Sequence, residues 1–132
     1  MNAISFLNLE LSGETLIVTP LRNIGSFAED EIHGEWTDLL SRVNEPDVKH
    51  VVLDFGSMEY FGSNVLEFVV QLAKRLKAKD GRLAICNATP VGNEILSVMR
   101  FDRLYPVVAT RADALKTVAG SSVASGESVA TG

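Results

Sequence analysis

The sequence predicts one α/β domain: a mixed β-sheet of four to five strands with about four helices, in which the central strands run parallel. An apolar run at 51–55 lacks polar alternation, as is typical of a strand buried on both faces of a sheet. A helical repeat of apolar residues follows over 63–79, and a second short apolar run follows at 82–87. A strand, a helix and a strand in this order predict two parallel strands joined by a right-handed crossover.

The chain opens with a predicted β-hairpin. Two β-rich runs occupy 6–11 and 15–21, and the segment Ser12-Gly13-Glu14 between them is typical of a tight turn. Pro20 weakens the end of the second strand, because proline cannot donate a hydrogen bond to the ladder.

An amphipathic helix is predicted next. Ser26 and Glu29 match a capping box, in which two side chains satisfy free backbone N–H groups at a helix start. Apolar residues then recur on one helical face: Ile32, Trp36, Leu39, Leu40 and Val43. The segment Asn44-Glu45-Pro46-Asp47 is expected to end this helix.

The second long helix, over 63–79, is expected to turn one apolar side to the core. That side is formed by Leu66, Val69, Val70, Ala73 and Leu76. Its last turns carry basic residues that suit the negative end of the helix dipole: Lys74, Arg75, Lys77 and Lys79. Asp80-Gly81 is expected to end the helix before the strand at 82–87.

The last third of the chain predicts shorter elements. A helix follows the cap Thr89-Pro90 and ends near Arg100, and an edge strand interrupted by Pro106 is expected within 104–109. A final helix is expected from Thr110 to about Val118, so that residues 1–118 form the domain. Residues 119–132 are Gly, Ser, Ala, Val and Thr with one Glu, which predicts a disordered tail.

Composition excludes several classes of protein. A net charge of −5 and a pI near 5 argue against nucleic-acid binding, which needs a basic surface. No apolar run approaches the roughly 18–20 residues that span a bilayer. The N-terminus lacks the basic segment and apolar core of a signal peptide, so a cytoplasmic location is expected. Cys86 is the single cysteine, which excludes an intrachain disulfide, and it is expected in the core.

The sequence predicts no enzyme, no metal site and no cofactor. His33 and His50 are the only histidines, and no His or Cys pair has the spacing of metal ligands. Serine, cysteine and histidine fall on unrelated predicted elements, so no nucleophile and base are brought together. Glycine motifs that bind phosphates or dinucleotides are absent from the sequence.

Ser63 stands where the loop after the strand at 51–55 starts a helix. The first turn of a helix presents unpaired N–H groups and a partial positive charge, and can therefore bind a phosphate. The Ser63 hydroxyl is expected to cap the helix, which stabilises a protein by about 1 kcal/mol, or to accept a phosphate, and the two roles are compatible. Asp54, at the strand end, is expected to organise the loop through backbone hydrogen bonds.

A second apolar stripe lies beside the core side of the same helix. It consists of Val65, Phe68 and Leu72, and two interpretations stay open: a wide buried face, or a partly exposed patch that docks another protein. Tyr60 and Phe61 in the preceding loop could add aromatic anchors to such a patch.

The order of elements, together with Asp54, Gly62-Ser63 and the turn Lys79-Asp80-Gly81-Arg82-Leu83, resembles a STAS domain over roughly residues 6–118. This fold is shared by bacterial anti-sigma factor antagonists and the cytoplasmic ends of sulfate transporters. Phe101-Asp102-Arg103-Leu104 resembles the family's link from third helix to final strand. In the antagonists a partner kinase phosphorylates the first serine of an Asp-Ser-Ser/Thr-Gly loop, and the resemblance puts Ser63 at that position.

The chain departs from the family pattern around this serine. Gly62 replaces the usual Asp, Asn64 replaces the second hydroxyl residue and Val65 replaces the Gly, while the loop at 21–25 also differs. These changes remove carboxylates from the face that kinase-regulated members offer to their kinase.

The resemblance implies a non-enzymatic regulator that binds an anti-sigma factor or a serine/threonine kinase and is switched by a phosphate on Ser63. The expected contact residues are Tyr60, Phe61, Gly62, Ser63, Asn64, Val65 and Phe68. Two alternatives stay open: a constitutive STAS scaffold or subunit without phosphorylation, and a sensor of a small ligand or nucleotide. A homodimer is also compatible with the sequence.

Overall fold

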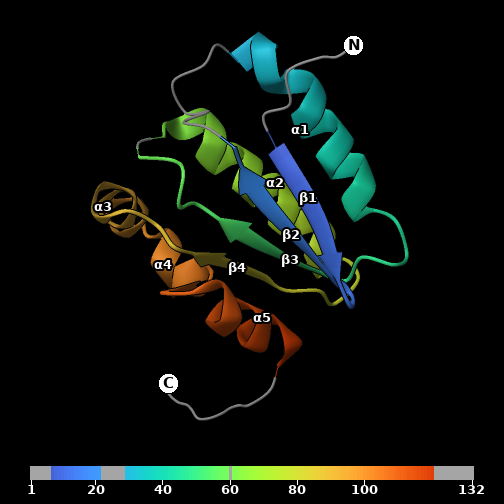
Figure 1. Ribbon diagram of the computed structural model, residues 1–132. Helices are drawn as coiled ribbons and strands as arrows, with labels where there is room; N and C mark the ends of the chain where they lie inside the picture. The colour runs from blue at the N-terminus through green and yellow to red at the C-terminus, as the bar shows by residue number, and fades with distance from the viewer. Residues whose placement is uncertain (1–6, 22–28, 60, 121–132) are drawn as a thin grey trace.

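The computed structural model describes residues 7–21, 29–59 and 61–120, with the side chains of 29–33 excepted. These residues form a five-stranded sheet and five helices (Figure 1). The strands are β1 (Leu7–Ser12), β2 (Thr15–Pro20), β3 (His50–Asp54), β4 (Leu83–Cys86) and β5 (Val107–Val108). The helices are α1 (Glu29–Val43), α2 (Ser63–Lys77), α3 (Pro90–Val98), α4 (Phe101–Leu104) and α5 (Arg111–Ala119).

The sheet has the order β1-β2-β3-β4-β5. The β1–β2 hairpin is antiparallel, and β2, β3, β4 and β5 pair in parallel. Because each parallel step needs a crossover, α1 and α2 carry the chain from β2 to β3 and from β3 to β4. The predicted mixed α/β sheet with parallel central strands is therefore confirmed.

Helices cover both faces of the sheet. Alternate strand residues point to opposite sides, so one face is buried under α1 and α2 and the other under α5. Leu16, Val51 and Ile85 belong to the larger core on the α1 and α2 side. The α5 side is smaller and includes Val52 and Ala114.

Two predicted elements differ from the structure. Phe101–Leu104 forms a one-turn helix, and the edge strand expected within 104–109 is reduced to Val107–Val108. Pro106 precedes β5 and has no N–H to donate, so the ladder cannot extend further back toward Leu104. Helix α2 also ends at Lys77 rather than at Lys79, and the Ser26 cap and the tail from 121 onward lie outside the described residues.

The turn Lys79-Asp80-Gly81 joins two parts of the molecule that are distant in sequence. The Lys79 ammonium donates to the carbonyl oxygens of Val43 at 2.5 Å, Glu45 at 3.1 Å and Val48 at 2.6 Å, so it caps the C-terminal end of α1. Asp80 adopts a positive φ of 61°. A Cβ on Gly81 would lie 1.8 Å from the carbonyl oxygen of Lys49, so only glycine fits there.

Candidate functional site

Ser63 is the first residue of α2, and its side chain is exposed. Gly62 is the N-cap: its backbone is extended, with φ −108° and ψ −166°, and its carbonyl accepts N–H groups of Val65 and Leu66 at 3.2 and 3.3 Å. No side chain caps this helix from the N-cap position, so the prediction that Ser63 is the N-cap is wrong by one residue. The side-chain oxygen of Asn64 instead accepts the Val65 N–H at 3.0 Å.

The Ser63 hydroxyl makes no hydrogen bond to any residue that the structure describes. The first turn of α2 carries no acidic residue, while the last turn carries Lys74, Arg75 and Lys77. The partial positive charge at the start of α2 is therefore not neutralised by a carboxylate in that turn. Glu67, one turn further along on the same side of the helix, is exposed.

Asp54 holds the loop that leads from β3 to α2. Its Oδ1 accepts the N–H of Gly56 at 3.0 Å, and its Oδ2 accepts the Asn87 amide at 3.1 Å and the Arg111 guanidinium at 2.9 Å. The residue is only 8% exposed, so these donors replace the water that its carboxylate loses.

Arg111 is a site residue that the sequence did not reveal. From the first position of α5 it donates to Asp54 on β3 and, at 3.0 Å, to the Thr19 hydroxyl on β2, and it lies 3.9 Å from the Glu10 carboxylate on β1. One guanidinium thus joins α5 to three strands. No local pattern signals this role, because Arg111 and Asp54 are 57 residues apart and meet only through the sheet topology.

Buried apolar side chains of the same loop pack into the core. Phe55, Met58 and Phe61 are buried, and the rings of Phe55 and Phe61 lie 5.1 Å apart. The Thr89 hydroxyl at the start of α3 donates to the Glu59 carbonyl at 3.3 Å, so α3 begins beside this loop. A rigid support therefore positions Ser63.

Several expected partner contacts lie inside the molecule. Phe61, Val65 and Phe68 are 7% exposed or less, and Leu72 is fully buried. The cause is that α2 packs against the sheet and against α1 at once, with the rings of Trp36 and Phe68 4.0 Å apart. The docking interpretation of this stripe is corrected to a wide buried face, and Tyr60 lies outside the described residues.

The exposed surface around Ser63 is mainly polar. Glu59, Ser63 and Glu67 are exposed, and Gly62 and Asn64 are half-buried. Val91 at the start of α3 adds an apolar side chain that is 48% exposed. This surface, formed by Glu59, Gly62, Ser63, Asn64, Glu67 and Val91, is called the Ser63 face below.

The other titratable side chains considered from the sequence are Cys86, His50 and His33. Cys86 is buried in β4, and burial first, then the nearby Asp54, raises the pKa of its thiol to about 11. Partial burial lowers the pKa of His50, whose Nδ1 accepts the Arg82 N–H at 3.0 Å. Within the described residues no group of three His, Cys, Asp or Glu side chains could hold a metal ion, and the His33 side chain is not described.

None of the described helices is long and apolar enough to cross a membrane.

The described residues form a small α/β module, and comparison with known proteins gives its family. The chain belongs to the STAS-domain family, whose model matches residues 8–114. The family inferred from the sequence is thereby confirmed.

A curated relative shares part of the sequence. The chain is 32% identical over 74 residues to BtrV of Bordetella bronchiseptica, whose name assigns it provisionally to the anti-sigma factor antagonists. The match covers 56% of this chain and spans 63% of the length of that relative.

Solved structures share the fold. A STAS-domain protein from Planctomyces limnophilus, described as an anti-sigma-factor antagonist, aligns with a TM-score of 0.76 and 23% identity, covering 86% of this chain and 98% of that one. The anti-sigma factor antagonist SpoIIAA in its unphosphorylated form aligns with a TM-score of 0.70 and 18% identity, covering 88% and 98%. Bacillus SpoIIAA in its phosphorylated form aligns with a TM-score of 0.61 and 18% identity, covering 85% and 98%. At these identities the likeness shows the fold alone.

Proposed function

We propose that this chain is an anti-sigma factor antagonist, a non-enzymatic regulator that binds an anti-sigma factor or a serine/threonine kinase reversibly through its Ser63 face. The observation that carries the proposal is the exposed hydroxyl of Ser63 on the first residue of α2. The hydroxyl has no partner among the described residues, and a buried loop scaffold supports its position.

Phosphorylation of Ser63 would act by charge. A phosphate adds about −1.5 to −2 charges at pH 7, and the start of α2 favours that charge through its free N–H groups. Glu59 and Glu67 are exposed on the same face, so the phosphate would make an already acidic surface strongly negative. A partner that fits the unmodified serine would then be released by repulsion and bulk, without unfolding of the domain.

The partner surface has a mixed character. Val91 offers one exposed apolar side chain at the start of α3, and Gly62, Ser63 and Asn64 offer polar groups at the start of α2. Interfaces of this kind are apolar at the centre and polar at the rim. The buried residues Phe61, Val65 and Phe68 serve as the support of this surface.

A constitutive STAS scaffold is the second candidate. The observation that favours it is the absence of acidic residues from the first turn of α2, where Gly62 and Asn64 stand in place of the residues that kinase-regulated members carry. In that role Ser63 would stay unmodified and the Ser63 face would bind its partner at all times.

Intact-mass spectrometry of the protein from its native host distinguishes the two candidates. The proposal expects a fraction with one added phosphate, which peptide mapping assigns to Ser63, in at least one growth condition. Absence of that species under every condition supports the scaffold. Recovery of any anti-sigma factor that the unmodified chain captures from its native host should fall with Ser63→Asp and stay unchanged with Ser41→Asp, a control at an exposed serine on α1.

A further inference from the structure

A groove lies at the opposite end of α2 from Ser63. It has a volume of about 530 Å³ and is formed by the last turns of α2, the start of β4, the segment Leu104–Pro106 and the last turn of α5. Its apolar lining consists of Val70, Ala73, Leu76, Leu83, Leu104 and Tyr105. Since α2 rises about 1.5 Å per residue, the groove begins at Val70, roughly 10 Å along the helix from Ser63.

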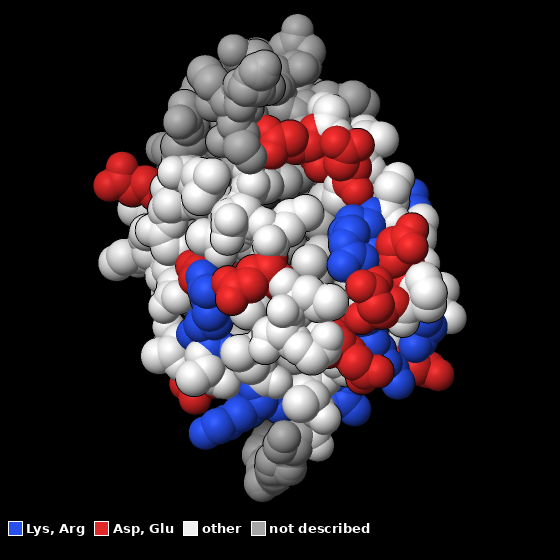
Figure 2. Space-filling model, turned by 45° about the vertical axis from the view of Figure 1, so that its right-hand side comes forward, with Lys and Arg blue, Asp and Glu red and all other residues white. Residues whose placement is uncertain are grey.

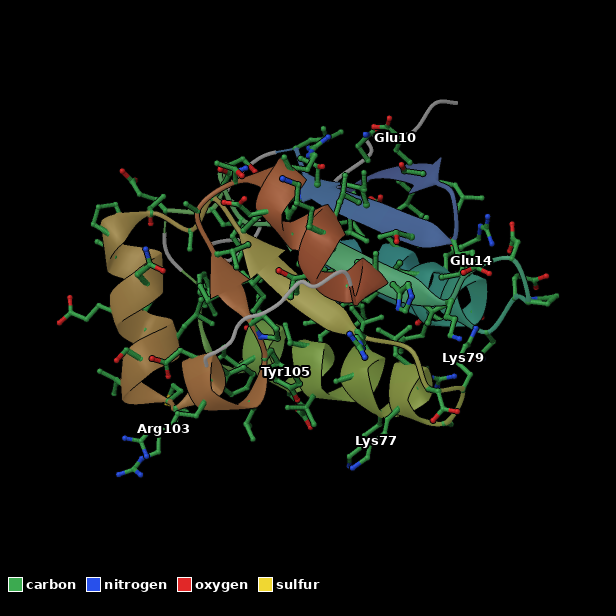
Figure 3. All side chains as sticks on the ribbon, turned by 90° about the horizontal axis from the view of Figure 1, so that it is seen from below. Glu10, Glu14, Lys77, Lys79, Arg103 and Tyr105 are labelled. Carbon is green, nitrogen blue, oxygen red and sulfur yellow. The ribbon has the colours of Figure 1, made fainter. Side chains whose placement is uncertain are left out.

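The rim of the groove is basic. Lys74, Lys77 and Arg82 line it, and none of them makes a salt bridge with a described residue. Figure 3 shows Lys77 projecting outward from α2, with Tyr105 lying against the same helix. In the view of Figure 2, basic and acidic side chains are interspersed over the lower half of the molecule. In a chain of net charge −5, such uncompensated cations favour an anionic partner.

The ladder between β4 and β5 is short beside the groove. β5 pairs only with Ile85 and Cys86, although β4 begins at Leu83. Parallel ladders alternate sides: the carbonyls of Arg82 and Cys86 accept from β3, and the Ile85 N–H donates to the Pro106 carbonyl on the β5 side. The backbone of Leu83 therefore faces the β5 side too, but Leu83 is only 4% exposed, so it forms the floor of the groove and is not an open strand edge.

One apolar side chain of the groove is largely exposed. Leu104, the last residue of the one-turn helix α4, is 65% exposed. An apolar groove with a charged rim suits a peptide that places apolar side chains against the lining and charges of opposite sign near the rim.

We propose that this groove binds an acidic peptide segment of another protein, with apolar side chains against Leu104 and Tyr105 and carboxylates near Lys74, Lys77 and Arg82. The site is separate from the Ser63 face and its existence does not depend on the proposed function. The same domain could then hold two protein segments at the two ends of one helix.

Selection from a random-peptide library against the full chain tests the proposal. The expected peptides combine apolar and acidic residues, and their affinity falls at least tenfold with Lys74→Glu/Lys77→Glu or with Leu104→Asp. Arg75→Glu and Val98→Asp are the matched controls, because Arg75 is an exposed cation on the same turns of α2 outside the groove and Val98 is 71% exposed on α3. Both controls should bind within twofold of the unmodified chain.

Amide spectra of the protein titrated with the best selected peptide give the second readout. Binding should shift the amide resonances of Lys74, Lys77 and Leu104, while the amide resonance of Ser63 stays unmoved. No enriched peptides, enriched peptides without acidic residues, or peptides equally tolerant of the groove and control variants would overturn the proposal. So would a dimer that Lys77→Glu dissociates, or groove amides that shift on removal of 121–132, since either result would assign the groove to this chain itself.

Discussion

The Arg111 guanidinium donates to the Asp54 carboxylate at 2.9 Å, joining the first turn of α5 to the end of the central strand β3. The Asp54 side chain is nearly buried, whereas that of Arg111 is 38% exposed. The same carboxylate holds the Gly56 N–H, which lies in the loop that supports Ser63. The pair therefore couples the α5 layer to the geometry of the Ser63 face.

Removal of Arg111 should destabilise the domain. With Arg111→Ala, Asp54 keeps the Gly56 and Asn87 donors but loses its charged partner, and hydrogen bonds to charged groups contribute about 1.5–3 kcal/mol. We expect the free energy of unfolding in urea to fall by about 2 kcal/mol. Arg103→Ala, at an exposed residue with no salt bridge among the described residues, should change it by less than about 0.5 kcal/mol. Equal effects of the two substitutions would show that the pair does not stabilise the fold.

Two glycine substitutions should change the stability of the fold in opposite directions. Gly81→Ala places a Cβ 1.8 Å from the Lys49 carbonyl oxygen, which requires backbone movement, so a loss of about 3 kcal/mol or more is expected. Gly34→Ala meets nothing within 4 Å in the interior of α1 and should raise stability by about 0.5–1 kcal/mol through helix propensity. Thermal unfolding of both variants checks this, and a Gly81→Ala protein with unchanged melting temperature would contradict the described turn.

His50 should make stability fall on acidification. Its pKa is lowered in the folded state, chiefly by burial, and its Nδ1 must be unprotonated to accept the Arg82 N–H. The unfolded chain therefore binds the proton more readily below about pH 6.5, so the His50 contribution is complete above that value and is lost as the pH falls through the folded pKa. The free energy of unfolding is measured against pH for the unmodified chain and for His50→Asn, and the difference between the two curves isolates the His50 contribution. A difference that does not change between pH 7 and pH 5 would contradict this prediction.

Cys86 should be inert in the folded protein. Its thiol is buried with a pKa of about 11, so little thiolate forms at pH 8 and reagents cannot reach it. Reaction with a thiol-specific chromogenic disulfide at pH 8 is expected to be at least a hundredfold slower in buffer than in guanidinium chloride. Rapid labelling of the native chain would mean that β4 is accessible from one face of the sheet.

Periodicity predicted the long elements well because each of them buries a regular stripe. Leu39 and Val43 on α1, and Leu66, Val69 and Leu76 on α2, are buried as the helical repeat requires. An unbroken apolar run predicted β3 correctly, because helices cover this strand on both faces of the sheet and both sets of its side chains are buried. Helix α4 was not predicted, because a helix of four residues is too short to show a helical repeat of apolar residues.

The site was harder to predict because its details depend on neighbours that are distant in sequence. Val65, Phe68 and Leu72 formed a visible stripe, but only the position of α1 decides that it is buried. Asp54 was singled out at its strand end, whereas its partner Arg111 comes from another layer. The cap lies at Gly62 because the chain enters α2 in an extended conformation one residue earlier than a hydroxyl would suggest.

The most direct test of the central claim is the dissociation constant for the anti-sigma factor that the unmodified chain captures from its native host, measured by calorimetry with phosphoserine incorporated at position 63. Phosphoserine at position 41 serves as the control for added charge. We predict binding that is at least tenfold weaker than that of the unmodified chain for the modification at 63, and unchanged binding for the one at 41. Equal affinity of all three proteins for that factor would contradict a charge-controlled switch at the start of α2.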